Sequence, residues 1–314
     1  MPSLVKAADL AALDVTLRTG FMGAYDNPGY VERWPLFATK QMSAGRANIY
    51  PQMIDAAQIR EWVEGERVVN GLVLVGATVT NQKFELTYGL RRTDVDDDLT
   101  GAVAQALSRM RSGANKYKRH PDKLVMGVVR GNTTCLDGLA LFHATHKLDP
   151  SNPDSATFSN TDSGALSANN VAAARAAMLE LKLPDGDPAN EDPNILLVPP
   201  ALELTARKIA QADVIVFSGS ANESNVMRGK YTVVVEPRLA ASTSGGSDTA
   251  WYLVDATDPE DRAVIYQERE AVEIVSQFNP ADPTVFNLDM YSWGTRCRHT
   301  VYGGNPKKIQ RRTG

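Results

Sequence analysis

Two histidines and a run of aspartates are the residues of this chain whose types and spacing could bind a metal ion. His143 and His146 lie three residues apart, and the acidic run comprises Asp94, Asp96, Asp97 and Asp98. Two imidazoles at this spacing can share one helical face, but the metalloprotease pattern H-E-x-x-H needs a Glu that is absent here. Clustered carboxylates suit a hard cation, although a helix N-terminus, where the dipole favours anions, accounts for them without a ligand. A metal-dependent enzyme using both groups is therefore one hypothesis.

Other patterns that carry chemistry do not occur in the sequence. It contains no G-x-S-x-G, no G-x-x-x-x-G-K-[ST] and no G-x-G-x-x-G, and the acidic loop from 185 to 192 lacks the EF-hand spacing. Cys135 and Cys297 match no metal or redox spacing, which favours reduced thiols. We therefore predict no catalytic residue, no cofactor-binding residue and no metal ligand. The basic segments 116–119 and 307–312 could contact phosphates, but solvated surface is the simpler interpretation.

Composition places the chain among proteins with a substantial core. It has 314 residues, a hydrophobic content of 43% and a formal net charge of -4, with a sequence pI near 5.7. These values give no general nucleic-acid footprint, and the length suggests about two domains or one elaborate domain. The N-terminus carries Asp9 and Asp14 and lacks the apolar run of a signal peptide. No apolar run is long enough to predict a membrane helix, so we expect no membrane association.

The longest predicted element runs from Thr93 to Gly131. Apolar residues at helical spacing begin at Leu99, the aspartates lie where an N-terminal cap would stand, and basic residues follow up to Pro121, which should stop the helix. The apolar run 124–131 then predicts a strand or buried segment. Upstream, residues 3–19 and 54–64 predict amphipathic helices, and residues 67–92 predict a hairpin-like β projection. The aromatic, irregular segment between residues 20 and 51 fits an arm laid across a neighbouring subunit, or a loop folded onto its own core.

Downstream of this helix, the pattern alternates between loops, helices and strands. A polar loop covers 149–170, helices are predicted at 171–183 and 201–215, and a short buried strand lies between them at 195–200. Four β-type runs follow, at 231–239, 250–256, 263–276 and 284–303, and the basic end 305–314 reads as a solvated tail. Residues from about 120 to 260 thus form a mixed α/β unit.

Several stretches together resemble the Mu-type phage major head subunit family, a branch of the HK97-type capsid proteins. They are the Trp34 region, REWVEGERVV (60–69), KFELTYGLRRTDVDDDLTG (83–101), DGLALFHATH (137–146), NILLVPPALELTARKI (194–209), KYTVVVEPRL (230–239) and DTAWYLVD (248–255). The resemblance implies an α+β, HK97-like fold: an N-terminal arm (1–44), an extended β loop (45–90), a spine helix of the peripheral domain (91–124), a mixed α/β axial domain (125–260), and closing peripheral strands with a basic tail (261–314).

The resemblance also implies a function and partners. It predicts a major capsid protein of a tailed bacteriophage or prophage, without enzymatic activity, that assembles as hexamers and pentamers into an icosahedral shell enclosing double-stranded DNA. Expected partners are a scaffolding protein, a portal, a possible decoration protein, and packaged DNA through weak non-specific contacts. The protein would be made in the host bacterial cytoplasm and end in the virion, with no fused scaffolding domain. An encapsulin-like shell that packages protein is a further alternative. The residues we expect at subunit interfaces are Trp34, Phe37, Trp62, Lys83, Phe84 and Glu85.

Overall fold

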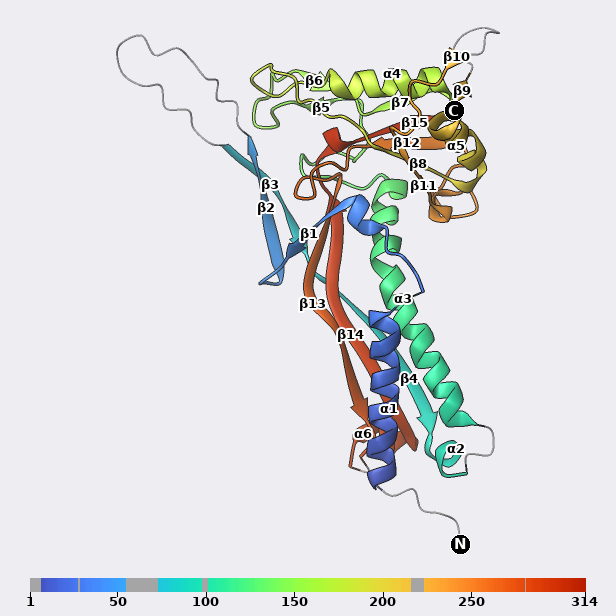
Figure 1. Cartoon of the computed structure of the whole chain (residues 1–314). Helices are drawn as coiled ribbons and strands as arrows, with labels where there is room; N and C mark the ends of the chain where they lie inside the picture. The colour runs from blue at the N-terminus through green and yellow to red at the C-terminus, as the bar shows by residue number, and fades with distance from the viewer. Residues whose placement is uncertain (1–6, 28, 55–72, 98–100, 216–222, 280) are drawn as a thin grey trace.

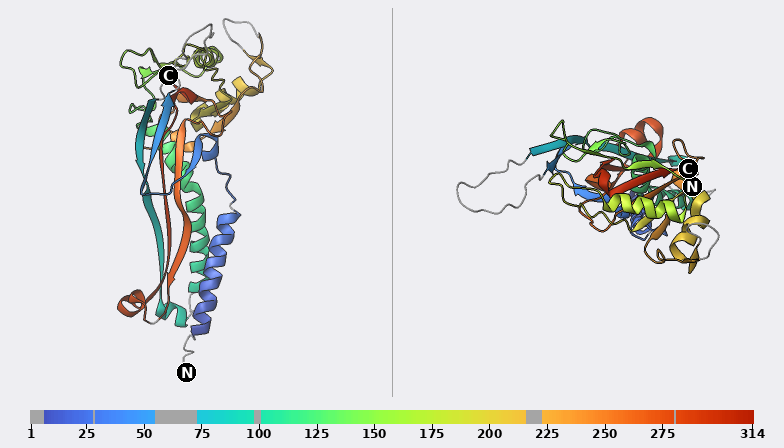
Figure 2. Two further views of the ribbon diagram at one scale, coloured as in Figure 1. Left: turned by 90° about the vertical axis from the view of Figure 1, so that its left-hand side faces the viewer. Right: turned by 90° about the horizontal axis from the view of Figure 1, so that it is seen from above.

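The computed structural model shows an elongated molecule made of a long stem and a broader unit at one end of it (Figure 1). It describes residues 7–27, 29–54, 73–97, 101–215, 223–279 and 281–314. The stem consists of two helices packed along a four-stranded sheet, and we call the broader end the upper unit. The first helix begins at the free end of the stem, whereas the last strand lies in the upper unit (Figure 2). No helix among the described residues is long and apolar enough to cross a membrane.

The stem sheet has the strand order β1-β13-β14-β4. Its strands are β1 (Ala38–Met42), β4 (Gln82–Arg91), β13 (Val264–Gln277) and β14 (Met290–Gly303); β1 pairs in parallel with β13, and the other pairs are antiparallel. On β4, exposed and half-buried residues alternate, because one sheet face packs on helices and the other is open. The turn between β13 and β14 contains α6 (Pro283–Leu288), a segment that the sequence pattern had wrongly placed inside a strand.

The helix α3 (Ala102–Gly131) joins the stem to the upper unit. Its first half packs Met110, Ala114 and Tyr117 into the stem core, and its last turns bury Val125 and Val129 in the core shared with the upper unit. The expectation that Pro121 ends the helix was therefore wrong, and of the two alternatives for 124–131, a strand or a buried segment, the structure shows a buried segment that is helical. A proline inside a helix costs ~3 kcal/mol. Burial on both sides of Pro121 outweighs this cost, and residues 124–129 are apolar because this part of the helix is buried on more sides.

The acidic run belongs to a separate short helix. Asp94, Asp96 and Asp97 lie in α2 (Arg92–Asp97), Asp98 lies outside the described residues, and α3 begins after Gly101, whose φ of 63° is left-handed. The prediction that these carboxylates cap the spine helix is therefore wrong. Asp94 instead stands in the first turn of α2, and Asp96 pairs with Arg92 one turn earlier.

The N-terminal segment folds onto its own chain. The helix α1 (Ala7–Asp26) packs along α3 and buries Leu10, Leu13, Leu17 and Phe21 in the stem core. A Cβ at Gly20 would lie 2.3 Å from the side chain of Leu107, so the two helices approach closely there. Residues 7–26 thus pack on the core of their own chain.

The upper unit is built on a five-stranded sheet in the order β11-β8-β12-β15-β7. Alternate residues of its central strands enter two cores: Leu196 and Trp251 pack under helices α4 and α5, whereas Leu197 and Tyr252 pack towards the end of α3. The bounds are β7 (Thr161–Ser163), α4 (Ala168–Leu179), β8 (Ile195–Val198), α5 (Glu203–Gln211), β11 (Thr232–Val235), β12 (Ala250–Val254) and β15 (Ile309–Thr313).

The strand β15 corrects the prediction of a solvated basic tail. It pairs with β12 and β7, and Ile309 and Arg312 are 1% and 7% exposed. Arg312 is accommodated by an ion pair of 3.0 Å with Asp162.

A two-stranded hairpin of β2 (Ala47–Ile54) and β3 (Val73–Thr80) projects sideways from the stem (Figures 1 and 2). The predicted helix 54–64 lies outside the described residues except for Ile54, which ends β2. The remaining short elements are β5 (His146–Lys147) with β6 (Thr157–Phe158), β9 (Val214–Ile215) with β10 (Glu223–Ser224), and the 3-10 helices η1 (Trp34–Leu36), η2 (Pro200–Leu202), η3 (Pro237–Leu239) and η4 (Pro306–Lys308).

Candidate assembly surfaces and buried clusters

Lys83 and Glu85 lie on the open face of β4, at the edge of the stem sheet. Both side chains are exposed, and β4 pairs with β14 on one side only. The same face carries Arg296 and Arg298 of β14, each 2.9 Å from a carboxylate oxygen of Glu270 on β13. The hydrogen bond from Arg298 lowers the pKa of Glu270 below its ordinary value. This charged sheet face is a surface that a second molecule can reach.

Phe84 points the other way, into a cluster of aromatic rings between β4, α3 and β14. Its ring centroid lies 4.7 Å from that of His299 and 4.4 Å from that of His120. The two histidines are hydrogen-bonded, with 2.9 Å between Nδ1 of His120 and Nε2 of His299. Burial, and then His120, lowers the pKa of His299 to about 4, so both rings are neutral at pH 7. Phe84 keeps partial exposure, in a shallow groove with Glu85 and Lys116.

The aromatic residues of the segment before β1 are largely occupied within the chain. Phe37 is 1% exposed and belongs to the core between stem and upper unit, so its side chain has no free surface for a neighbour. Trp34 is half-buried and lies against Tyr266, with 4.6 Å between ring centroids and 43° between the ring planes. Trp62 lies outside the described residues. Lys83 and Glu85 are therefore the most accessible of the predicted interface residues that the structure describes.

Asp122 is a buried carboxylate that fixes the path of this segment across the spine helix. It is 1% exposed; its Oδ1 accepts hydrogen bonds from the backbone N–H groups of Arg33, at 3.1 Å, and Trp34, at 2.5 Å, and its Oδ2 accepts one from the Tyr30 hydroxyl. The N–H groups of Arg33 and Trp34 stand at the start of η1, where helix N–H groups lack internal partners. The Arg33 guanidinium in turn donates to the carbonyl of Val235, in β11 of the upper unit. Asp122 thus ties the segment to stem and upper unit together, a role that its sequence context did not indicate.

The hairpin is anchored at its base by a buried polar network. Asn81 donates to the Ser43 hydroxyl at 2.8 Å and accepts from the Gln267 side chain at 2.7 Å. Tyr50 of β2 donates to Gln267 as well, at 2.6 Å, and Val79 of β3 is buried against the stem. The network orients the hairpin relative to the stem sheet. Ile49, the residue before Tyr50 in β2, is 72% exposed.

The predicted histidine pair does not form a metal site with the aspartates. His143 and His146 lie in a loop and in β5 of the upper unit, whereas the described aspartates lie in α2 at the far end of the stem (Figure 1). The partners of His146 are instead Asp137, 2.5 Å from Nδ1, and the Leu141 carbonyl. Cys135 completes the group, with its thiol 2.9 Å from Asp137.

Cys135, Asp137 and His146 are a group whose donor atoms are near enough to hold a metal, but the chemistry favours a hydrogen-bonded turn. Burial raises the pKa of the Cys135 thiol, which keeps it protonated, whereas metals bind the thiolate. Hydrogen bonds from His146, Cys135 and the Leu139 N–H lower the pKa of Asp137 against the opposing effect of burial, and occupy its oxygens. In the sequence this group is a C-x-D pattern, Cys135 and Asp137, whose aspartate stands nine residues before His146.

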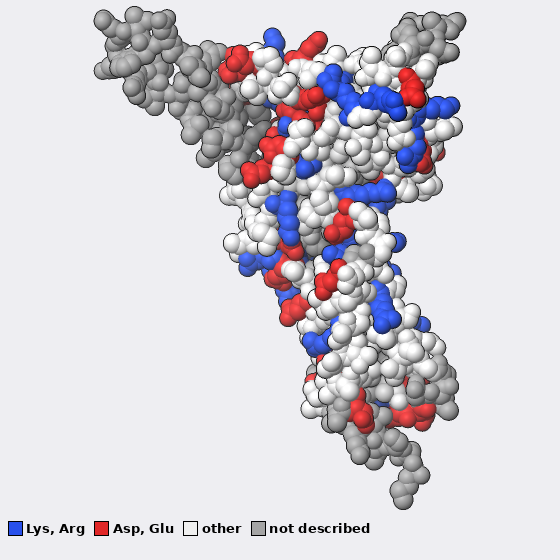
Figure 3. Space-filling model, viewed as in Figure 1, with Lys and Arg blue, Asp and Glu red and all other residues white. Residues whose placement is uncertain are grey.

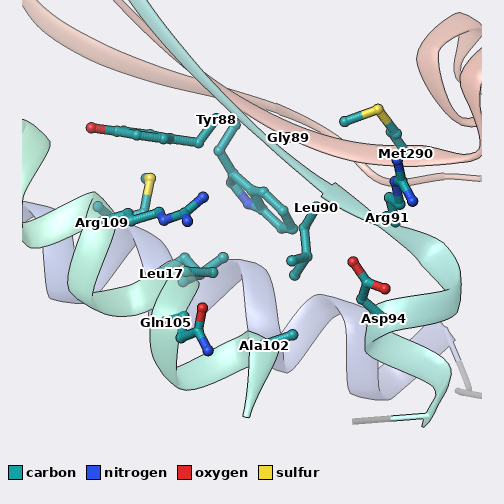
Figure 4. Close-up of a pocket in the computed structure, with 13 residues that line it drawn as sticks. Leu17, Tyr88, Gly89, Leu90, Arg91, Asp94, Ala102, Gln105, Arg109 and Met290 are labelled. Atoms are coloured by element: carbon teal, nitrogen blue, oxygen red, sulfur yellow. The ribbon is translucent and has the colours of Figure 1, made fainter. Parts of the chain in front are cut away.

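A cavity of about 300 Å³ lies where α1, α3 and β4 meet near the foot of the stem (Figure 4). Its lining combines core side chains such as Leu17 and Trp293 with three charged ones, Arg91, Asp94 and Arg109. The charged groups come from β4, α2 and α3, and Arg109 stands across the cavity from Arg91 and Asp94 (Figure 4). They do not converge as the polar groups of a ligand site do.

A projecting hairpin, a spine helix along a four-stranded sheet and a separate α/β unit together define the HK97-like capsid fold. Solved structures agree with this class. The procapsid protein of bacteriophage JBD30 matches with a TM-score of 0.56 and 22% identity over 98% of this chain and 76% of that one. The capsid of the native GTA particle matches with a TM-score of 0.53 and 12% identity, over 91% of this chain and 92% of that one. The mature capsid of phage PhiM1 matches with a TM-score of 0.52 and 11% identity, over 91% of this chain and 89% of that one.

The sequence comparisons narrow the class to a family. The model of the Mu-like prophage major head subunit gpT matches residues 10–167, 163–239 and 236–305, and the chain belongs to that family. The major capsid protein of Escherichia phage Mu is 29% identical over 150 residues, 47% of each chain, and the FluMu major head subunit of Haemophilus influenzae is 26% identical over 111 residues, 35% of each. The matched part thus spans about half, or less, of these curated relatives. The family consists of structural head proteins, so the hypothesis of a metal-dependent enzyme is wrong.

Proposed function

We propose that this chain is the major subunit of an icosahedral phage head, which assembles as hexamers and pentamers and encloses double-stranded DNA. The observation that carries the proposal is the β2–β3 hairpin, which is anchored on the stem by Tyr50 and Val79 yet extends clear of both large sheets. Each of its strands pairs only with the other among the described residues. An isolated two-stranded hairpin is marginally stable in water, so a neighbouring subunit is its natural support.

The stem, the upper unit and the hairpin have different roles in this assembly. The stem acts as the peripheral domain and the upper unit as the axial domain, whose copies surround the five- and six-fold axes. The reaching loop corresponds to 47–80 within the range 45–90, because β4 belongs to the stem sheet. Lys83 and Glu85, with the exposed edge of Phe84, form the surface on which a neighbour rests. Repeated contacts of this head-to-tail kind close into rings.

The proposed partners follow from the relatives. A scaffolding protein and a portal accompany assembly, which the existence of a JBD30 procapsid supports. A decoration protein is proposed because the JBD30 capsid is decorated with minor capsid protein trimers. The subunit is made in the cytoplasm of the bacterial host and becomes part of the virion.

The proposal is tested by expressing the chain with its scaffold and imaging the product by negative-stain electron microscopy. Closed particles are expected; a species that stays monomeric under every assembly condition would overturn the proposal. Ile49→Lys on the hairpin should prevent closure without changing the unfolding midpoint of the free subunit. Val15→Lys on α1, where the side chain is 62% exposed, is the matched control and should still assemble. Normal particles from Ile49→Lys would contradict the role of the hairpin.

A further inference from the structure

A row of cations runs along the outward face of α3. Arg109, Lys116 and Lys123 are spaced seven residues apart, so they lie nearly in line along the helix, and Arg119 stands beside the line one turn before Lys123. All four side chains are exposed, and we call them the spine stripe. Blue atoms are visible along the side of the stem where α3 lies (Figure 3).

The charges of the spine stripe are not neutralised within the chain. None of the four forms an ion pair with another residue that the structure describes, and Arg119 only lies over the ring of Tyr30, 4.8 Å from its centroid. Of the other cations of α3, Lys118 is 3.9 Å from Glu32 and Arg130 donates to the Arg238 carbonyl, whereas Arg111 lies off the stripe, in a groove lined by residues of α1. The one acidic residue of α3, Asp122, is buried and faces inward. The helix therefore presents uncompensated positive charge in a chain whose net charge is negative.

The chemistry of this face selects its ligand. The side chains that share the face with the stripe are polar or small: Gln105, Ser108, Ser112 and Gly127. A bound protein segment would need an apolar centre of contact, which this face does not offer. On the β4 side the stripe borders the shallow groove that Lys116 lines with Phe84, Glu85 and Leu86, where we place the subunit contact. A row of charges without apolar anchors suits a regular polyanion.

We propose that the spine stripe binds the phosphate backbone of double-stranded DNA without regard to sequence. From Arg109 to Lys123 the helix rises about 21 Å, since each residue adds about 1.5 Å. Over that length one DNA strand presents roughly six phosphates, at about 3.4 Å per phosphate along the axis, so four flexible cations can each reach one. Contacts to phosphates alone hold DNA without reading its bases, as a container for arbitrary DNA requires. This inference rests on the proposed function, because it assigns the stem face that meets the enclosed DNA.

The test measures binding of a fluorescent 30-base-pair duplex of random sequence to the unassembled full-length subunit by anisotropy, at several salt concentrations. Four phosphate contacts give a slope of log affinity against log salt of about -3.6, or a roughly 100-fold loss of affinity between 50 and 200 mM salt. Changing Arg109, Lys116, Arg119 and Lys123 to Gln should bring the slope close to zero. The matched control changes four exposed cations elsewhere, Arg46, Lys182, Lys208 and Arg228, to Gln and removes the same net charge. This control variant should keep a slope of log affinity against log salt that differs from the wild-type slope by less than about one unit.

The outcomes separate the alternatives. Equal losses in both variants, or a wild-type slope near zero, would overturn the proposal. Binding to a poly-glutamate peptide at least as tight as binding to the duplex would also overturn it, in favour of an acidic protein partner such as a scaffold. Particle formation is scored separately for each variant. Particles built from subunits that do not bind DNA would defeat this inference alone, whereas subunits that bind DNA but never assemble would defeat the proposed function.

Discussion

Replacing Asp122 tests whether one buried carboxylate sets the path of the chain across the spine helix. Asp122→Ala removes the acceptor for three donors, the N–H groups of Arg33 and Trp34 and the hydroxyl of Tyr30. Hydrogen bonds to a charged acceptor contribute about 1.5–3 kcal/mol each, but the three share one group and partly exposed donors recover some solvation. We expect the free energy of unfolding to fall by about 3–5 kcal/mol.

Two milder substitutions make the estimate specific. In Asp122→Asn, the remaining Oδ1 still accepts from Arg33 and Trp34, and the new amide can donate to the Tyr30 oxygen, so only the charge is lost, at about 1–2 kcal/mol. Tyr30→Phe removes one hydrogen bond and should cost about 1 kcal/mol. In the Asp122→Ala background the same Tyr30→Phe change should cost almost nothing, because its partner is already absent.

The assay is guanidinium unfolding of the unassembled subunit, followed by circular dichroism, for wild type, the two single variants and the double variant. The coupling between Tyr30 and Asp122 should be about 1 kcal/mol. The reasoning fails if Tyr30→Phe costs the same in both backgrounds, or if Asp122→Ala lowers the free energy of unfolding by less than about 1 kcal/mol. Either result would mean that packing around Trp34 holds the segment without the carboxylate.

Two further predictions concern the upper unit and its junction with the stem. Glu191 is 6% exposed beside Lys308, 2.5 Å away, and burial raises the pKa of Glu191 to about 7. The folded carboxyl thus keeps its proton to a higher pH than the ordinary value of 4.5, so its contribution to stability is full below about pH 4.5 and is lost as pH rises through 7. Wild type should therefore lose about 2–3 kcal/mol relative to Glu191→Gln between pH 4.5 and 8, measured by denaturant titration; parallel profiles would refute this. A Cβ at Gly303 would lie 2.7 Å from Cys135 Cβ and 2.8 Å from the Thr134 carbonyl oxygen, so Gly303→Ala should cost about 1–3 kcal/mol. Gly127→Ala, with nothing within 4 Å, should instead stabilise α3 by roughly 0.5–1 kcal/mol when both variants are compared by guanidinium unfolding, and equal effects of the two changes would count against the close contact.

Local patterns predicted the elements whose burial is one-sided or complete. The buried strand β8, the helix α5 and the alternation along β4 all follow from periodicity, and that alternation is why Lys83 and Glu85 were expected on a surface. The HK97-like fold was identified from the resemblance of ordered segments and is confirmed by the structural relatives. Periodicity alone would not have arranged these elements in space.

The wrong predictions share a physical cause, which is that distant residues overrode a local signal. The run 124–131 is helical because it continues a helix already buried upstream, and a short apolar run does not distinguish helix from strand. The basic end became β15 because it pairs with β12 and β7, both far away in sequence, and buries Ile309. The sequence did not predict the role of Asp122, because the N–H groups that it binds stand about 90 residues earlier in the chain.

The buried polar groups and the exposed surfaces of this chain have complementary roles in assembly. Asp122 fixes the segment before β1, and the network of Ser43, Asn81 and Gln267 fixes the base of the hairpin. Buried polar groups are costly unless their partners are correctly placed, so each network favours one arrangement and penalises the others. Shell closure requires the angle between hairpin and stem to be reproduced in every subunit. The exposed hairpin can therefore make weak individual contacts, because the buried networks hold the geometry in which many such contacts form at once.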